Sequence, residues 1–221
     1  MAEYNMQNRR EFLRYMLGAT ALLGSGASLL ASPALTAKGM SKLTILYTND
    51  VHSRIEPFPD NDPKYPNQAG AARRAAIIKK IRAEEKNVLL LDAGDIFQGT
   101  PYFNFYAGEL EYKLMSQMGY DLATLGNHDF DLGVDNIIQQ LPNASFEFVC
   151  ANYNFKDSPL AGRINPYKII VKDGLTIGIF GLGIELKGLV EKKNYGDIIY
   201  NDPIETAKNF YAATGVKPQY H

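Results

Sequence analysis

The sequence contains a single cysteine, three histidines and almost no net charge, because 23 Lys and Arg residues balance 24 Asp and Glu residues. One cysteine excludes a disulfide within the chain and argues against a thiolate-rich metal site. A net charge of −1 argues against binding to nucleic acid or to an anionic membrane through bulk charge. We therefore expect no nucleic-acid partner.

Two local features have ordinary structural interpretations. The cysteine, Cys150, lies in an apolar run, so we predict a buried strand residue rather than a nucleophile. The basic pair Arg73 and Arg74 is followed at helical spacing by Glu84 and Glu85, which indicates a solvated helix face.

The N-terminal part of the chain has the layout of an export signal. Paired arginines in residues 8–14 precede an apolar, glycine- and alanine-rich stretch over residues 15–30, and small residues follow over 31–37. We predict a twin-arginine-type signal peptide over residues 1–37 and a periplasmic or cell-envelope location. The alternative is a retained membrane anchor, which the three glycines within the apolar stretch disfavour. We expect no stable membrane insertion after signal removal.

The 221 residues suffice for one ordinary domain, in which strands and helices are expected to alternate. Apolar runs predict strands over residues 43–48, 88–91, 122–124, 146–150, 167–171 and 175–180. Helix formers and apolar spacing predict helices over residues 69–86, 109–117, 134–140 and 205–213. This alternation predicts an α/β fold, with a sheet that carries helices on both faces.

Acid, amide and imidazole side chains follow three of the predicted strands directly. Residues 49–52 (Asn-Asp-Val-His) follow the first strand, residues 92–95 (Asp-Ala-Gly-Asp) the second, and residues 126–131 (Gly-Asn-His-Asp-Phe-Asp) the third. Ligands of open α/β sheets bind outside the carboxyl ends of the strands, so the three clusters are expected to converge. In an extended segment, Asp50 and His52 would point to the same side and could bind one ion together.

This residue set indicates a metal site. Carboxylate oxygen and imidazole nitrogen suit Zn, Mn or Fe. A carboxylate shared by two ions about 3.5–4 Å apart would hold the bridging hydroxide of a two-metal phosphatase, and Asp95 is the candidate for that role. Each cluster alone has a structural alternative, such as a Gly-Asp turn or a helix N-cap with a surface histidine. The order of the clusters, their placement and their residue types together favour the metal site.

Three segments resemble the calcineurin-like metallophosphoesterases, and in particular their bacterial 5′-nucleotidase branch. They are residues 43–52 (LTILYTNDVH), 91–99 (LDAGDIFQG) and 125–133 (LGNHDFDLG), and the resemblance extends over about residues 42–202. It implies a layered, metallophosphatase-type β-sheet sandwich flanked by helices. The catalytic domain would occupy residues 42–221.

The resemblance also implies roles for individual residues. Asp50 and His52 would ligate the first of two divalent ions, Asp95 would bridge both, and Asn127 would ligate the second. The ions would be Zn, Mn or Fe, and the substrate a nucleotide or another phosphate ester.

Two further residues of the third segment would act on the substrate. The resemblance places His128 beside the phosphate, where it stabilises charge or protonates the leaving oxygen, while Asp131 orients its imidazole. Asp92 has no implied role, and we interpret it as a turn residue or an outer contact of the site.

The segment after residue 202 departs from the family pattern. The histidine-containing clusters that supply further metal ligands in the family are not recognisable, and His221 lacks their glycine-rich context. We therefore expect a partial catalytic domain, incomplete at its C-terminus and without the family's nucleobase-stacking domain.

Two classes of function follow. The first is an exported two-metal phosphoric-ester hydrolase that acts on 5′-nucleotides, cyclic nucleotides or nucleotide sugars. The second is an inactive metal-binding fragment, or a catalytic half that needs a separately encoded nucleotide-binding domain. The aromatic residues within 102–106 either line a substrate cleft or pack within helix and loop.

Overall fold

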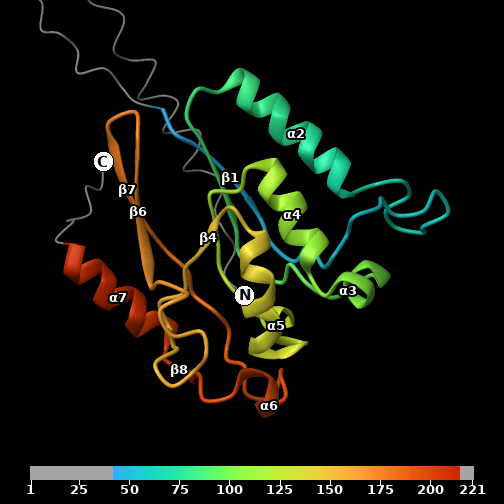
Figure 1. Ribbon diagram of the computed structural model, residues 1–221. Coiled ribbons are helices and arrows are strands. Elements are labelled where there is room, and N and C mark those ends of the chain that lie inside the picture. Colours follow the sequence, from blue (N-terminus) through green and yellow to red (C-terminus); the bar gives the residue numbers. More distant parts are fainter. Residues whose placement is uncertain (1–41, 215–221) are drawn as a thin grey trace, which may run out of the picture. The chain divides into compact units, whose positions relative to one another are not determined.

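A parallel sheet of four strands forms the centre of the described part of the chain, residues 42–214 of a computed structural model (Figure 1). The strand order is β1-β2-β3-β4, with bounds Thr44–Thr48, Val88–Asp92, Leu122–Ala123 and Glu147–Phe148. The uninterrupted apolar run in β2 suits a strand covered on both faces. The predicted signal peptide and His221 lie outside the described residues.

Two helices cover one face of this sheet: α2 (Ala71–Glu84) and α4 (Glu109–Met118). Leu46 and Leu90 point from the sheet toward Ile78 of α2, with which they line one cavity. On α4, the Tyr112 ring lies 5.2 Å from the ring of Phe148. These contacts form the main core of the domain.

A hairpin lies against the opposite face. Its strands are β6 (Tyr167–Lys172) and β7 (Leu175–Phe180), and the turn residues Asp173 and Gly174 both have positive φ, as the hairpin prediction requires. Tyr47 and Leu91 of the sheet share a cavity of about 280 Å³ with Ile179 of the hairpin.

The last helix, α7 (Pro203–Thr214), packs on the outer side of the hairpin. The Phe210 ring lies 5.2 Å from Phe180 and 5.7 Å from Tyr167. The hairpin covers the second face of the central sheet, so the helix on that side packs on the hairpin and not on the sheet itself. The resulting layers confirm a sheet-on-sheet arrangement flanked by helices (Figure 1).

Shorter elements complete the described residues. They are α3 (Pro101–Tyr106), η1 (His128–Phe130), α5 (Gly133–Gln140), η2 (Leu141–Asn143), β5 (Tyr153–Asn154), α6 (Lys192–Tyr195) and β8 (Ile199–Tyr200). Helix α3 was not predicted. The strand predicted over residues 146–150 is only two residues long, so Cys150 follows it and does not belong to it. Cys150 is buried as expected, and its N–H donates a hydrogen bond to Asn165 O.

The parallel direction of the sheet fixes the position of the site. Because β1, β2 and β3 run the same way, the loops that follow them emerge at one edge. Within residues 42–214, no helix has both the length and the apolar composition of a membrane span.

Candidate metal centre

The loop after β1 carries two of the predicted ligands in a left-handed turn. Asp50 has φ 50°, His52 φ 44° and Ser53 φ 53°. The expectation that an extended backbone aligns Asp50 with His52 is wrong, although the two side chains do meet. Main-chain bonds to the loop after β2 hold the turn, from Asp50 N to Gly94 O at 3.0 Å and from His52 N to Asp95 O at 3.1 Å.

Asp50, His52 and Asp95 form a three-residue cluster. His52 Nε2 lies 3.7 Å from Asp50 Oδ1 and 4.0 Å from Asp95 Oδ2, and one ligand atom from each residue falls within 4.8 Å of the others. The Asp50 side chain is 58% exposed and that of Asp95 only 15%, so the cluster opens to solvent on the Asp50 side.

The hydrogen bonding of His52 suits metal ligation. Its Nδ1 lies 3.3 Å from the carbonyl oxygen of Phe97, which can only accept, so Nδ1 carries the proton. The other ring nitrogen, Nε2, faces Asp50 and Asp95. A neutral imidazole fixed by a backbone carbonyl is the usual form of a ligating histidine. Together with two carboxylates, it fits a divalent ion such as Zn, Mn or Fe.

Asp95 connects the loops that follow β2 and β3. Its Oδ1 accepts the main-chain N–H of His128 at 2.9 Å, while its Oδ2 faces His52. Asn127 precedes His128 and caps η1, where its carbonyl accepts the N–H of Phe130 at 3.1 Å. Asn127 therefore lies in the loop that borders the cluster, and its role as a ligand remains a prediction.

His128 and Asp131 form the ion pair that the sequence suggests. His128 Nδ1 lies 3.0 Å from Asp131 Oδ2, and this hydrogen bond raises the pKa of His128 above its usual value, against a smaller effect of burial. The rings of His128 and His52 are 5.1 Å apart, edge to face. The His128 side chain is 39% exposed and so remains accessible to a substrate at the cluster.

Asp129 is a site residue whose role the sequence analysis missed. It is fully buried, and its carboxylate accepts the N–H groups of Asp95, Ile96, Phe97 and Gly126 at 2.8–3.2 Å. Burial raises the pKa of Asp129 to about 7, and two of these hydrogen bonds oppose the rise. The side chain therefore ties the β2 loop to the β3 loop. Its position directly after Asn127 and His128, in the third polar cluster, is the feature of the sequence that could have identified it.

Asp92 acts as the turn residue that we expected. It is buried, its Oδ1 accepts Gly94 N at 2.9 Å, and its Oδ2 accepts the Thr48 hydroxyl at 2.5 Å. Burial raises the pKa of Asp92 to about 6. The hydrogen bonds link the ends of β1 and β2, directly before the residues that carry the cluster.

Two glycines let the loops approach each other. A Cβ at Gly94, which has φ 97°, would lie 2.4 Å from Gly126 N. A Cβ at Gly126 would lie 2.1 Å from Oδ1 of Asp95. Both contacts are far shorter than real Cβ contacts, so any side chain at either position would push Asp95 away from His128.

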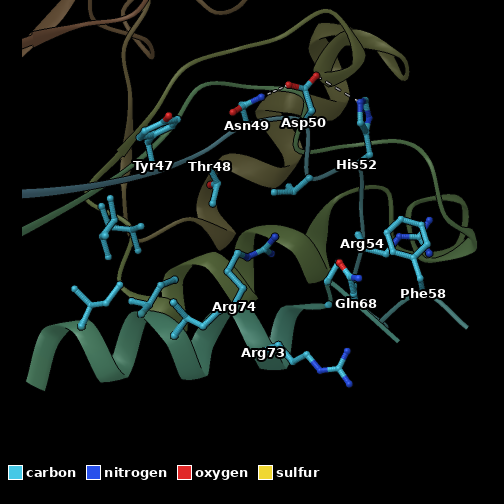
Figure 2. Close-up of a pocket in the computed structure, with 18 of the residues that line it drawn as sticks. Tyr47, Thr48, Asn49, Asp50, His52, Arg54, Phe58, Gln68, Arg73 and Arg74 are labelled. Atoms are coloured by element: carbon cyan, nitrogen blue, oxygen red, sulfur yellow. Dashed lines mark hydrogen bonds and ion pairs between the residues drawn. The ribbon is translucent and has the colours of Figure 1, made fainter. Parts of the chain in front are cut away.

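A cavity of about 870 Å³ adjoins the cluster between β1 and α2 (Figure 2). Asp50 and His52 lie at one end of it, and Arg54 covers the Phe58 ring at 4.2 Å. The aromatic residues of α3 do not line this cavity. Phe103 is buried, whereas Phe105 is 81% exposed, so the packing interpretation holds for Phe103.

A match to a known protein family covers all three loops. Residues 43–218 match the calcineurin-like phosphoesterase family. The chain belongs to this family. Membership confirms the resemblance seen in the sequence, and it supports a divalent-metal role for the cluster because the family uses divalent metals.

Curated relatives of this calcineurin-like phosphoesterase include 5′-nucleotidases. The snake venom 5′-nucleotidase of Gloydius brevicauda is 42% identical over 167 residues, which cover 72% of this chain and 28% of the relative. The 5′-nucleotidase of Homo sapiens is 42% identical over 172 residues, which cover 74% of this chain and 29% of the relative. The chain thus spans less than a third of the length of these relatives.

Solved structures show the same likeness. The 5′-nucleotidase precursor from Thermus thermophilus superposes with a TM-score of 0.70 at 39% identity, over 79% of this chain and 35% of that one. The NAD nucleotidase of Haemophilus influenzae superposes with a TM-score of 0.68 at 32% identity, over 77% and 31%. The α/β fold of the calcineurin-like phosphoesterase is therefore shared with nucleotidases.

Proposed function

We propose that the chain is a metal-dependent phosphoric-ester hydrolase of the 5′-nucleotidase type. The observation that carries the proposal is the convergence of three strand-end loops, which brings Asp50, His52 and Asp95 within 4.8 Å of one another and sets the His128 ring beside His52. The relatives that the chain resembles are named for the same reaction class.

In this proposal, the loops hold two divalent ions. Asp50 and His52 would bind the first ion, Asp95 would contact both, and Asn127 would bind the second. Bound there, the ions would supply positive charge against the phosphate and lower the pKa of an attacking water. Hard carboxylate oxygens beside an imidazole favour Zn, Mn or Fe over softer metals.

His128 is the proposed acid or charge-stabilising group. Because Nδ1 faces Asp131, Nε2 is the nitrogen available to a phosphate oxygen or a leaving oxygen. The raised pKa of His128 increases the fraction of imidazolium near neutral pH, which favours proton donation. Asp131 also limits rotation of the ring, so the donor stays directed at the substrate.

The substrate proposed is a nucleoside 5′-monophosphate. The test is phosphate release from 5′-AMP by the purified chain with added Mn²⁺ or Zn²⁺, compared with His128→Ala. Loss of a general acid typically lowers kcat by about 10²–10⁴-fold. Release that does not exceed the background of the His128→Ala variant would refute the hydrolase and support an inactive metal-binding fragment. Release that requires a co-purified nucleotide-binding domain would support a catalytic half.

We also propose that the protein is exported, since residues 1–37 carry the twin-arginine pattern. The test is fractionation of bacterial cells that produce the full chain or its Arg9→Lys/Arg10→Lys variant. We expect the full chain in the periplasm and the variant in the cytoplasm. An unchanged distribution of the variant would contradict this route.

A further inference from the structure

A buried carboxylate bonds to the residue that follows His52, and it lies outside the residues assigned above. Glu111 of α4 is only 3% exposed. Its Oε1 accepts a hydrogen bond from the hydroxyl of Ser53, and no described residue bonds to its Oε2. A buried carboxylate is unfavourable unless its partners compensate for lost hydration, so its position calls for a specific role.

Ser53 is the residue through which Glu111 reaches the cluster. It follows His52 directly, is 1% exposed, and closes the left-handed turn with φ 53°. The N–H of Ser53 donates to Ile96 O at 2.8 Å. The Thr100 hydroxyl lies 2.7 Å from the carbonyl oxygen of Ser53 and 2.9 Å from the hydroxyl of Ser53. The polar groups of Ser53 are therefore all fixed by neighbours.

This turn requires support because it is unfavourable on its own. Residues other than glycine rarely adopt positive φ, yet Asp50, His52 and Ser53 all do. Such backbone persists only where surrounding contacts determine it. The Glu111 carboxylate accepts the hydrogen bond of the Ser53 hydroxyl, so it is one of the contacts that determine this turn.

Arg74 supplies a positive charge near Glu111. The two residues line one small cavity of about 10 Å³, and Arg74 extends from α2 toward the end of β1 (Figure 2).

We propose that Glu111 is a positioning residue for the metal centre. By accepting a hydrogen bond from the Ser53 hydroxyl, Glu111 holds the turn that directs His52 Nε2 toward Asp95. The inference rests on the proposed metal-dependent function. Loss of an outer contact of this kind typically weakens metal affinity about 10–100-fold.

The test separates positioning from packing by means of a double variant of the full chain. Ser53→Ala alone leaves Glu111 without its donor, and Glu111→Leu alone leaves the Ser53 hydroxyl without its acceptor. The double variant removes both groups, so its thermal midpoint should recover toward wild type. Its Mn²⁺ affinity, measured by calorimetry, should nevertheless fall roughly tenfold or more. A smaller fall in a folded double variant would overturn the proposal.

Two matched variants complete the experiment. Glu111→Gln keeps an acceptor for Ser53 and should retain more affinity than the double variant. Glu109→Gln changes an exposed carboxylate on the same helix, which pairs with Lys113, and should bind Mn²⁺ like wild type. If the double variant does not fold, Glu111→Met with Ser53 intact is judged by the same tenfold criterion.

Absence of Mn²⁺ binding by the wild type would refute the proposed function rather than this inference. The positioning role is then judged by NMR of the metal-free protein. The His128 ring, 5.1 Å away, should shift the His52 ring signals in wild type, and this shift should be lost in the double variant. An identical His52 spectrum in the two proteins would overturn the inference.

Discussion

The N–H of His128 donates to Oδ1 of Asp95 at 2.9 Å, across 33 positions of sequence. The bond joins the loop that carries the proposed bridging carboxylate to the loop that carries the proposed acid. The other oxygen of Asp95 faces His52, so this one side chain lies between all three loops. Metal binding and the placement of His128 should therefore depend on the same residue.

Replacement of Asp95 tests this dependence. Asp95→Asn keeps an oxygen that can accept the His128 N–H but removes the negative charge. We expect Mn²⁺ affinity to fall by more than the roughly 10–100-fold typical of an outer contact, with a small change in thermal midpoint. Calorimetric titration measures this, with the exposed Asp135→Asn as control. Equal affinity of Asp95→Asn and Asp135→Asn would rule out Asp95 as a ligand.

The ionisation of His128 should depend on Asp131. Since the hydrogen bond from Asp131 raises the pKa of His128, Asp131→Asn should lower that pKa toward about 6.5. NMR titration of the metal-free protein measures the change. The folded-state pKa exceeds the unfolded value, so the pair stabilises the fold below about pH 6.5, and this contribution is lost as pH rises through the folded-state pKa. An unchanged pKa in Asp131→Asn would contradict the pairing.

Asp129 should be needed for the fold itself. Asp129→Ala leaves four buried or partly buried N–H groups without their acceptor, each at a cost of about 1–3 kcal/mol before relaxation and hydration. We expect a loss of about 3–5 kcal/mol in the free energy of unfolding, measured with urea. The control is Asp157→Ala at an exposed position, which should change stability little. Similar stabilities of the two variants would show that the carboxylate does not join the loops.

The close approach at Gly126 gives a steric prediction. Gly126→Ala would place Cβ 2.1 Å from Asp95 Oδ1, so we expect a loss of about 1–3 kcal/mol together with weaker Mn²⁺ binding. Gly178→Ala on β7 is the control, because nothing lies within 4 Å of the added Cβ. Urea unfolding and calorimetry report the two effects. Wild-type behaviour of Gly126→Ala would mean that the loops can separate freely.

The sequence predicted the location of the site because strand direction determines it. The apolar runs at β1, β2 and β3 each end at a polar cluster, and parallel strands bring such ends to one edge. Asp50, His52 and Asp95 do lie together there, which confirms the convergence. The pairing of His128 with Asp131 was expected from the resemblance to the calcineurin-like phosphoesterases, and the two side chains do lie 3.0 Å apart.

The sequence could not predict how the candidate ligands are held. The left-handed turn at Asp50 and His52 depends on main-chain bonds to a loop more than 40 residues away, which local pattern does not contain. The burial of Asp129 and of Glu111 depends in the same way on tertiary packing. The hairpin was predicted correctly, but its position against the sheet involves tertiary contacts of Lys172 with Asp121 and with the carbonyl of Val88, which alternation alone does not reveal.

Binding of a divalent ion by Asp50, His52 and Asp95 is tested most directly by anomalous X-ray diffraction at the manganese absorption edge, from crystals of the chain grown with Mn²⁺. We expect an anomalous peak in contact with His52 Nε2 and with carboxylate oxygens of Asp50 and Asp95. No peak there, or a peak held by other residues while these three stay free of metal, would contradict it.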